Sequence, residues 1–283
     1  MKLNAICMVK NEQDVIIETL ENALLFCDTI YVFDNGSTDG SYEKIQALSK
    51  ENPKVVIAAH SDEIFKNQLR NRVYNLYNHQ YTHDDWWYIL DADEMLNESP
   101  KPMLKIASQK GKDHMRVWQA QFYFTDKDFE NYILEDRSKT ITERRRFYKI
   151  NWREVRFFKN NPDQKWSEGV SGRIPPHCNN LYRPSPICRH YAERTPEQIK
   201  QRRNIRIGNP YSFFHVKNKS DNDWLKKSNT LNYFSREKTL TFSFNEVAGY
   251  YWSEIRFWCF HKVNGIKKRV LQLIQHTPFS PSC

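Results

Sequence analysis

The sequence has 283 residues, of which 39% are hydrophobic and 27% are charged, and its formal net charge is +9. This length can bury a substantial core, and the composition excludes a disordered chain. The six cysteines are scattered without a Cys-x-x-Cys pair, which excludes the usual zinc-site spacing and a compact disulfide framework. The basic excess favours an anionic partner, which can be nucleic acid, a phosphorylated ligand or an anionic membrane surface.

Short apolar runs alternate with amphipathic segments over residues 1–90. Four of the runs predict buried strands, at residues 3–9, 29–33, 55–59 and 86–90. Asn11 is expected to cap the first helix, with Asp14 in its first turn. Apolar residues at helical spacing predict the buried helix positions, namely Ile16, Leu20, Ala23 and Cys27, then Tyr42, Ile45 and Leu48, then Phe65, Leu69, Val73 and Leu76. Strands that alternate with helices predict an α/β fold with a mostly parallel sheet covered on both faces.

Polar clusters follow three of these strands, at the edge where ligands of parallel sheets bind. Asp91 and Asp93 are two residues apart at a strand end, so both carboxylates point the same way and can share one hard cation. Such a cation can bridge the two phosphates of a nucleotide diphosphate. The alternative is that one of these aspartates caps a following helix. Asp34 ends another strand and can accept hydrogen bonds from a base or a ribose; its alternative is a solvated turn in which Asp39 caps the next helix.

The pattern changes after residue 100. An alternating segment over 116–124 and a basic, aromatic run over 146–158 predict antiparallel strands. Thr195-Pro196-Glu197 predicts the start of a helix, with the threonine as its cap. A second, less regular half therefore follows the parallel one.

Four motif blocks follow one another in the first hundred residues. They are Met8-Val9-Lys10-Asn11-Glu12, Phe33 to Ser41, Leu69-Arg70-Asn71 and Leu90-Asp91-Ala92-Asp93-Glu94. In these blocks the chain resembles glycosyltransferase family two, and most of all its bacterial enzymes that build lipopolysaccharide core and related surface glycans. The resemblance is specific over residues 3–96 and looser over 144–200. It implies a GT-A fold, a nucleotide-diphosphate sugar donor (a UDP-sugar before others), a divalent metal such as Mn²⁺ or Mg²⁺, and inversion at the anomeric carbon.

The resemblance also implies roles for single residues. Asp34 matches the aspartate that contacts the nucleotide. Asp91 and Asp93 match the metal motif, which places Asp91 beside the nucleotide sugar as well. Glu12 matches a strand-end acid beside the nucleotide. Arg70 matches a basic residue near the donor, and an arginine on a helix surface is its alternative.

The looser region supplies further residues. Arg156-Phe157-Phe158-Lys159 resembles the family's Arg-Leu-Phe-Arg strand. A following segment resembles its His-Glu block and makes Glu168 the expected general base for the acceptor hydroxyl, with Ser167 where the histidine is usual. A third segment resembles its His-Tyr block, so His190 is expected to complete the coordination of the metal or to meet the diphosphate. The alternatives are an exposed turn glutamate and a structural histidine.

The expected organisation is a glycosyltransferase domain over residues 1–205 and a C-terminal extension over 206–283. Residues 1–98 would bind the nucleotide sugar and 99–205 would face a glycan or glycolipid acceptor. Basic and aromatic residues gather from Tyr250 onward, which suits a helix at an anionic membrane or one docked on the domain. The apolar segment after Met1 is too short for a signal peptide and no stretch could span a bilayer. We therefore expect a cytoplasmic location, either free or peripheral on the inner membrane.

Two other classes of function fit parts of the pattern. A phosphatase of the haloacid dehalogenase type also carries Asp-x-Asp after a strand, but Met95 stands where that class has Thr or Val, and the motif lies too deep in the chain. A nucleic-acid-binding protein would need a coherent basic face. The basic residues are spread along this chain, and acids crowd its strand ends. Both alternatives are therefore minor.

Overall fold

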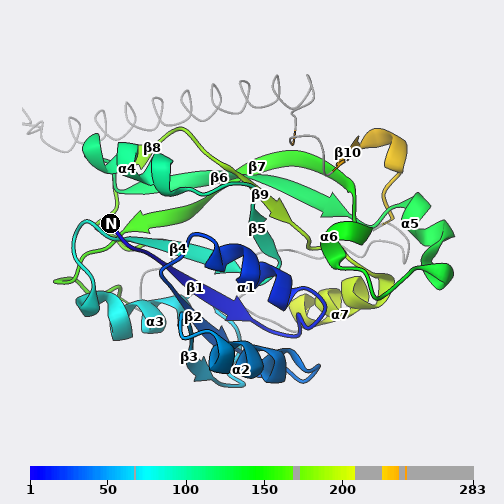
Figure 1. The fold of residues 1–283 in the computed structure, drawn as a ribbon, viewed down its shortest axis with the longest axis horizontal. Coiled ribbons are helices and arrows are strands. Elements are labelled where there is room, and N and C mark those ends of the chain that lie inside the picture. The colour runs from blue at the N-terminus through cyan, green and yellow to red at the C-terminus, as the bar shows by residue number, and fades with distance from the viewer. Residues whose placement is uncertain (67, 168–172, 208–224, 236–239, 241–283) are drawn as a thin grey trace, which may run out of the picture. The chain divides into compact units, whose positions relative to one another are not determined.

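The computed structural model describes residues 1–66, 68–167, 173–207, 225–235 and 240, which form a mixed sheet flanked by helices (Figure 1). The strands are β1 (Leu3–Val9), β2 (Thr29–Asp34), β3 (Val55–His60), β4 (Trp86–Asp91), β5 (Glu94–Leu96), β6 (His114–Tyr123), β7 (Phe147–Lys159), β8 (Leu181–Tyr182), β9 (Ile187–His190) and β10 (Asn232–Tyr233). The helices are α1 (Ile16–Leu24), α2 (Ser41–Glu51), α3 (Leu69–Tyr77), α4 (Lys101–Gln109), α5 (Asp126–Glu130), α6 (Ile141–Arg144) and α7 (Pro196–Ile207), with 3₁₀ turns η1 (Asn78–Gln80), η2 (Tyr132–Leu134) and η3 (Ser228–Thr230).

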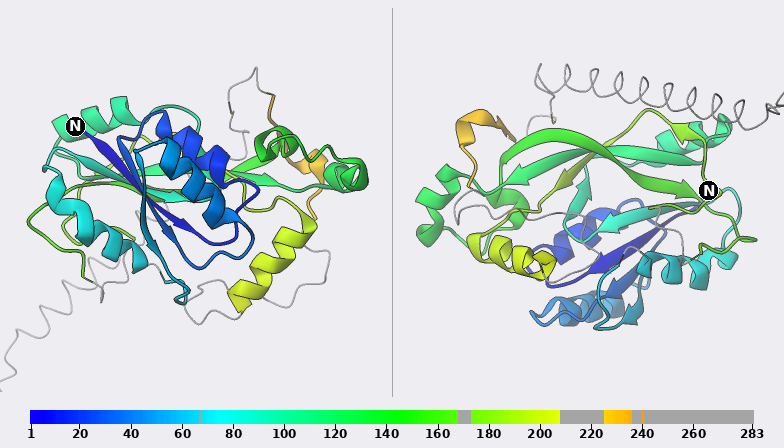
Figure 2. Two further views of the ribbon diagram at one scale, coloured as in Figure 1. Left: turned by 60° about the horizontal axis from the view of Figure 1, so that its bottom comes forward. Right: turned by 180° about the vertical axis from the view of Figure 1, so that it is seen from behind.

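The sheet joins a parallel half to an antiparallel half. Its order is β3-β2-β1-β4-β7-β6-β9-β5, with β10 beside β7 and β8 beside β6. Strands β3, β2, β1 and β4 are parallel, and β7 then runs antiparallel to both β4 and β6. The four predicted parallel strands and the predicted antiparallel pair are confirmed, each within one or two residues of its expected ends. The carboxyl ends of the parallel strands form one edge, and α7 lies beyond the end of β1 in both Figure 1 and Figure 2.

Strand β1 shows why helices cover both faces. Its odd-numbered residues, from Leu3 to Val9, are at most 1% exposed and pack against α1, α2 and α4. Its even-numbered residues Ile6 and Met8 pack instead against α3. A strand whose two sets of side chains are both buried must lie inside the sheet, and this explains its continuous apolar sequence.

Aromatic side chains anchor α3 on the second face. Tyr74 of α3 is fully buried, with ring centroids 5.5 Å from Trp87 and 6.0 Å from Trp166. The indole N–H of Trp87 donates to Asn160 Oδ1 at 2.8 Å, so the ring is satisfied on its polar side as well. This packing fixes the helix whose first turn carries Arg70.

Several details of the predicted helices are wrong: Asp14 lies before α1 instead of in its first turn, and Phe65 lies before the start of α3. Asn11 does not cap α1, which begins at Ile16 and has Val15 at its N-cap. Asn11 lies in a loop with a positive φ of 55°, because its polar groups bond to the loop after β2. Leu76 is 55% exposed, and Tyr74 takes the buried position of that turn. The expected inward residues Ile16, Leu20 and Ala23 of α1 are fully buried, and Cys27 is also buried but lies after the end of the helix.

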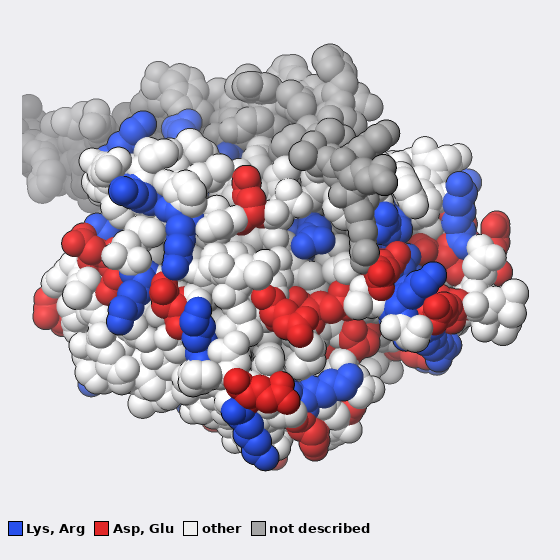
Figure 3. All heavy atoms as spheres, in the orientation of Figure 1, with Lys and Arg blue, Asp and Glu red and all other residues white. Residues whose placement is uncertain are grey.

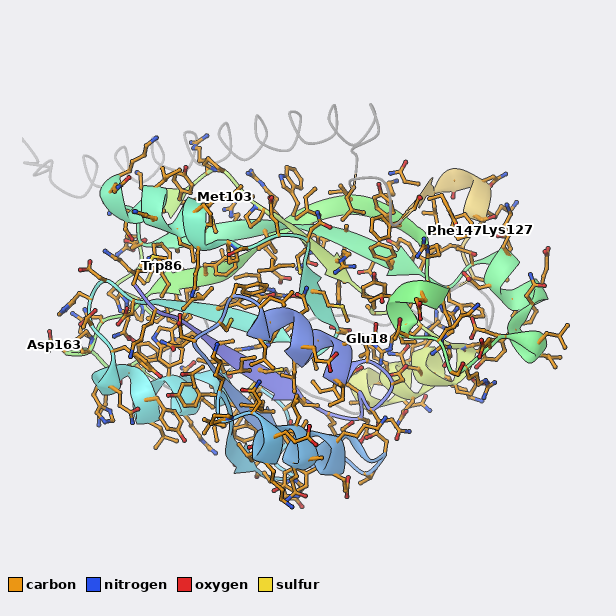
Figure 4. All side chains as sticks on the ribbon, in the orientation of Figure 1. Glu18, Trp86, Met103, Lys127, Phe147 and Asp163 are labelled. Carbon is orange, nitrogen blue, oxygen red and sulfur yellow. The ribbon has the colours of Figure 1, made fainter. Side chains whose placement is uncertain are left out.

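Residues 125–146 form a compact insertion between β6 and β7. Thr125 begins α5 with a capping box, in which its hydroxyl oxygen accepts from the Asp128 N–H. Glu18 of α1 accepts from the backbone N–H groups of Ile141 and Thr142 at 2.8 and 3.2 Å, and so holds the start of α6 (Figure 4). The helix α7 begins at Pro196, as the sequence predicts. None of the helices in the described ranges is both long and apolar enough to cross a membrane.

Candidate active site

The loops after β1 and β2 are held together by hydrogen bonds between them. The Asn11 N–H donates to Ser37 Oγ at 3.0 Å, and Asn11 Oδ1 accepts from the Thr38 N–H at 2.8 Å. The Glu12 N–H donates to Ser41 Oγ at 2.8 Å. The serines and threonine of the second motif block are therefore loop-to-loop connectors, which hold the acids of the two strand ends at fixed positions.

Gly36 is required in this loop for two reasons. Its φ is +70°, and a Cβ at this position would lie 2.9 Å from the Cα of Asp62. Any larger residue would push the loop after β2 away from the segment after β3. The turn is therefore built to bring the ends of β2 and β3 close together.

Asp34 is completely buried at the end of β2. Its Oδ2 accepts from the Ser37 N–H at 3.0 Å and from His60 Nδ1 at 2.8 Å, and His60 is its register neighbour on β3. Asp39 accepts from the Ser41 N–H and hydroxyl, beside the start of α2. Asp34 is thus fixed at the sheet edge rather than solvated in a turn.

Asp91 lies at the end of β4 between two arginines. Arg70 Nη2 donates to its Oδ1 at 2.6 Å, and Arg156 Nη2 donates to its Oδ2 at 2.7 Å. Burial acts to raise the pKa of Asp91, but Arg156 and Arg70 outweigh it and bring the value down to about 2. Arg70 is only 8% exposed, so it is a site residue and not an arginine of the helix surface.

Asp93 is held by cationic groups from β9 and α7. Arg202 Nη1 donates to its Oδ2 at 2.6 Å, and His190 Nε2 lies 3.4 Å from its Oδ1. Burial opposes ionisation of Asp93, but His190 and Arg202 hold its pKa well below the usual range. In return Asp93 raises the pKa of His190 against the effect of burial. Neither Asp91 nor Asp93 caps a helix, because β5 follows directly and the next helix begins at Lys101.

Glu12 and Asp14 share one buried arginine. Arg194 pairs with Glu12, donates from Nε to Asp14 Oδ2 at 2.9 Å, and lies 3.8 Å from Asp93. Burial raises the pKa of Glu12 to about 7, although Arg194 lowers it. Arg194 therefore connects the loop after β1 with the Asp-x-Asp segment.

A second buried cluster, in which Glu94 pairs with Arg156, holds the side chain of Asp91 in place. Glu94 is fully buried and accepts from Arg156 Nε at 2.7 Å and from Gln119 Nε2 at 2.8 Å. Arg156 of β7 is 2% exposed and pairs with Glu94 of β5 and Asp91 of β4, and Gln119 of β6 joins the cluster through Glu94. The Arg-Phe-Phe-Lys segment pointed to Arg156, but neither its partner Glu94 nor the roles of Arg194 and Arg202 had a signal in the sequence.

The four oxygens of Asp91 and Asp93 determine whether a divalent metal fits here. Carboxylates are suitable ligands for a hard cation. Three of these oxygens accept from arginines and the fourth faces His190. Among the described residues, no three acids, histidines or cysteines are grouped so that they could hold a metal ion. The chemistry of the two aspartates therefore fits a metal, and their present partners are cationic side chains that such an ion would have to replace.

The remaining expected site residue is Glu168, which lies outside the described residues. The chain just before it is held on α3. Asn71 Nδ2 donates to the Ser167 carbonyl and Asn75 Nδ2 to the Trp166 carbonyl, both at 2.9 Å. The segment that leads to Glu168 is therefore attached to the helix that carries Arg70.

The sequence comparison decides the family of this chain. A sequence model described as Glycosyl transferase family 2 matches residues 5–165. The chain belongs to this family. Residues 5–165 therefore carry the family 2 glycosyltransferase domain that the motif blocks predict. The family typically uses a divalent metal.

Solved structures of glycosyltransferases resemble this chain at low sequence identity. TarS 1-349 from S. aureus shares 13% identity with a TM-score of 0.44, over 73% of this chain and 65% of that one. The mannosyltransferase PcManGT from Pyrobaculum calidifontis, in complex with GDP-Man and Mn2+, shares 13% identity with a TM-score of 0.42, over 75% of this chain and 71% of that one. The chain thus spans less than two thirds of the TarS fragment. Among curated proteins there is no match.

Proposed function

We propose that this glycosyltransferase transfers a sugar from a UDP-sugar to a hydroxyl group of a glycan or glycolipid, with inversion at the anomeric carbon. The observation that carries the proposal is the meeting of Asp34, Asp91, Asp93 and Arg70 at one edge of the parallel sheet. Ligands of such sheets bind at this edge. The resemblance of the motif blocks to lipopolysaccharide-core enzymes supports a place in bacterial surface glycan synthesis, either of lipopolysaccharide or of capsule.

The donor would lie across the strand ends. Asp34 would accept hydrogen bonds from the base or ribose, and Glu12 would lie beside the nucleotide. Arg70, which already contacts Asp91, would contribute positive charge toward the diphosphate. Arg156 and Arg194 are buried among acids, so their part would be to hold Asp91 and Glu12 in place.

Asp91 and Asp93 would hold a divalent metal, Mn²⁺ or Mg²⁺, and His190 would complete the set only after turning from its present pairing with Asp93, since the three side chains as they lie do not form a metal-binding group. Bound there, the metal would neutralise the charge that develops on the leaving diphosphate. Arg202 is the least buried arginine on these two aspartates, with a side chain 26% exposed, and it is the group best able to leave Asp93.

Glu168 would be the general base. Its carboxylate would take the proton of the acceptor hydroxyl while that oxygen attacks the anomeric carbon and the bond to the diphosphate breaks. Attack from the face opposite the diphosphate would give inversion.

Figure 3 shows Lys and Arg interspersed with Asp and Glu on the face that carries α1, which gives no support to a nucleic-acid surface there.

Thermal-shift screening of nucleotide sugars, with and without Mn²⁺, tests this function. A bound donor raises the melting temperature because it binds only the folded chain. We expect stabilisation by a UDP-sugar that depends on Mn²⁺ and is lost in Asp93→Asn. Asp84→Asn is the matched control, because Asp84 is 85% exposed and away from the strand ends. If no nucleotide sugar stabilises the wild-type chain, the proposal is wrong.

A further inference from the structure

His60 and Asp34 form a side-chain pair at the edge of the sheet, between the ends of β3 and β2. The distance from His60 Nδ1 to Asp34 Oδ2 is 2.8 Å. Because a carboxylate can only accept, Nδ1 is the protonated nitrogen in this pair. The imidazole also stacks on Tyr42, with ring centroids 4.0 Å apart and an angle of 28° between planes. The ring is thus fixed both by a hydrogen bond and by an aromatic neighbour.

The two oxygens of Asp34 differ in what they can still bind. Oδ2 already accepts two hydrogen bonds, from His60 and from the Ser37 N–H. Oδ1 is buried and meets no hydrogen-bond donor among the described residues. A buried acceptor without a partner is costly, so a donor from a ligand would bind there favourably. The side chain of His60 is 44% exposed and that of Asp34 is 0% exposed, so a base would reach Oδ1 only when the side chains around it make room.

We propose that His60 is a positioning residue that leaves Asp34 one free oxygen, which accepts from a single N–H group and so selects uracil over guanine and cytosine as the base of the donor. The inference rests on the proposed function, in which Asp34 contacts the nucleotide. His60 acts through Asp34: by occupying Oδ2 it leaves only Oδ1 for the base.

The chemistry of the bases gives the selectivity. Uracil presents one ring N–H between two carbonyl oxygens, and one free acceptor satisfies it. Guanine presents a ring N–H beside an amino group, and this edge needs two acceptors to be fully paired. Cytosine has no proton on the equivalent ring nitrogen. A carboxylate with one free oxygen therefore pairs better with uracil, or with thymine, which presents the same edge, than with guanine or cytosine, and leaving the second donor of guanine unpaired has a free-energy cost.

Replacing His60 separates positioning from general stability. In His60→Ala, Oδ2 loses a donor and the carboxylate can turn both oxygens toward the base. We expect UDP affinity to fall about tenfold and GDP affinity to fall less or to rise, so that the preference for UDP shrinks. His60→Asn should restore the preference, because the amide N–H can donate from nearly the position of Nδ1. His83→Ala is the control for loss of an exposed histidine that pairs with an aspartate.

Isothermal titration of the full chain with UDP, GDP and CDP measures these preferences. A purely structural role for His60 would weaken all three nucleotides alike and leave their ratios unchanged. An unchanged ratio in His60→Ala, or a wild-type preference for GDP, would overturn the inference while leaving glycosyl transfer intact. If the wild type binds none of the three nucleotides, the proposed function itself is wrong.

Discussion

Arg156 offers the clearest stability test of the site, because its removal would leave a buried acid without its cation. Glu94 is 0% exposed, and of the three hydrogen bonds that it accepts from described residues two come from Arg156, at 2.7 and 2.5 Å. Removing one partner of a buried ion pair costs about 3–5 kcal/mol. Domains of this kind unfold with about 5–15 kcal/mol, so Arg156→Met should remain folded but be strongly destabilised.

A double-mutant cycle then separates the unpaired charge from lost packing. Glu94→Gln removes the charge and keeps an acceptor for Gln119. If the uncompensated carboxylate is the main cost, the double variant Glu94→Gln, Arg156→Met should be more stable than Arg156→Met alone, with a coupling of about 0.5–3 kcal/mol.

Urea unfolding followed by circular dichroism gives these free energies, and a constant slope with denaturant shows that the unfolded state is unchanged. Arg72→Met is the matched control. Arg72 pairs with Glu63 at 2.6 Å, but both side chains are more than a third exposed, and exposed pairs contribute about 0–1 kcal/mol. A loss below about 1 kcal/mol in Arg156→Met would refute the assignment of a buried, charge-balancing role.

Asp91→Asn should reduce the loss in the free energy of unfolding that the wild-type chain shows when the pH falls. The pKa of Asp91 is lowered to about 2 from 3.8, so its stabilisation is complete above 3.8 and is lost as the pH falls toward 2. Urea midpoints of the wild type and the variant at about pH 5 and pH 2.5 measure this loss, and the same fall in midpoint for both proteins would contradict the prediction. Glu168→Gln should keep donor affinity in titration calorimetry and lose transfer; a wild-type rate would place the base elsewhere. Deletion of residues 250–283, which lie outside the described residues, should release the protein from sedimenting anionic liposomes, and equal binding of both forms would exclude a membrane role for the tail.

The parallel half of the fold was predictable because its signals are local. Each buried strand is a short apolar run, and alternation with helices requires parallel pairing. Asp34 and Asp91 could be named because the carboxyl ends of such strands lie at one edge. The domain boundaries at 205 and 98 stay predictions, although β10 (Asn232–Tyr233) pairs with β7.

The partners of the acids could not be predicted, because they come from distant parts of the chain. Arg194 is 182 residues from Glu12, and Arg202 is 109 residues from Asp93. The spacing of apolar residues along the sequence gives no information about such long-range ion pairs. The prediction that Asn11 caps a helix was wrong for a related reason. The side chain of Asn11 accepts a hydrogen bond from the Thr38 N–H, 27 residues away, and no helix signal in the sequence reveals this partner. Competition between local capping and long-range bonding is decided only in the folded chain.

The charged side chains around Asp91 show that some basic residues of the sequence serve to balance buried acids. Glu12, Asp14, Asp91, Asp93 and Glu94 gather at one sheet edge, and acids so close would repel one another if they were uncompensated. Arg70, Arg156, Arg194 and Arg202 pair with them there, and the first three have side chains less than 10% exposed. Buried charges persist only when they are paired, so these arginines are a condition for keeping an acidic site at this edge. The four arginines and five acids named here sum to a formal charge of −1, so the net charge of +9 comes from basic residues elsewhere in the chain.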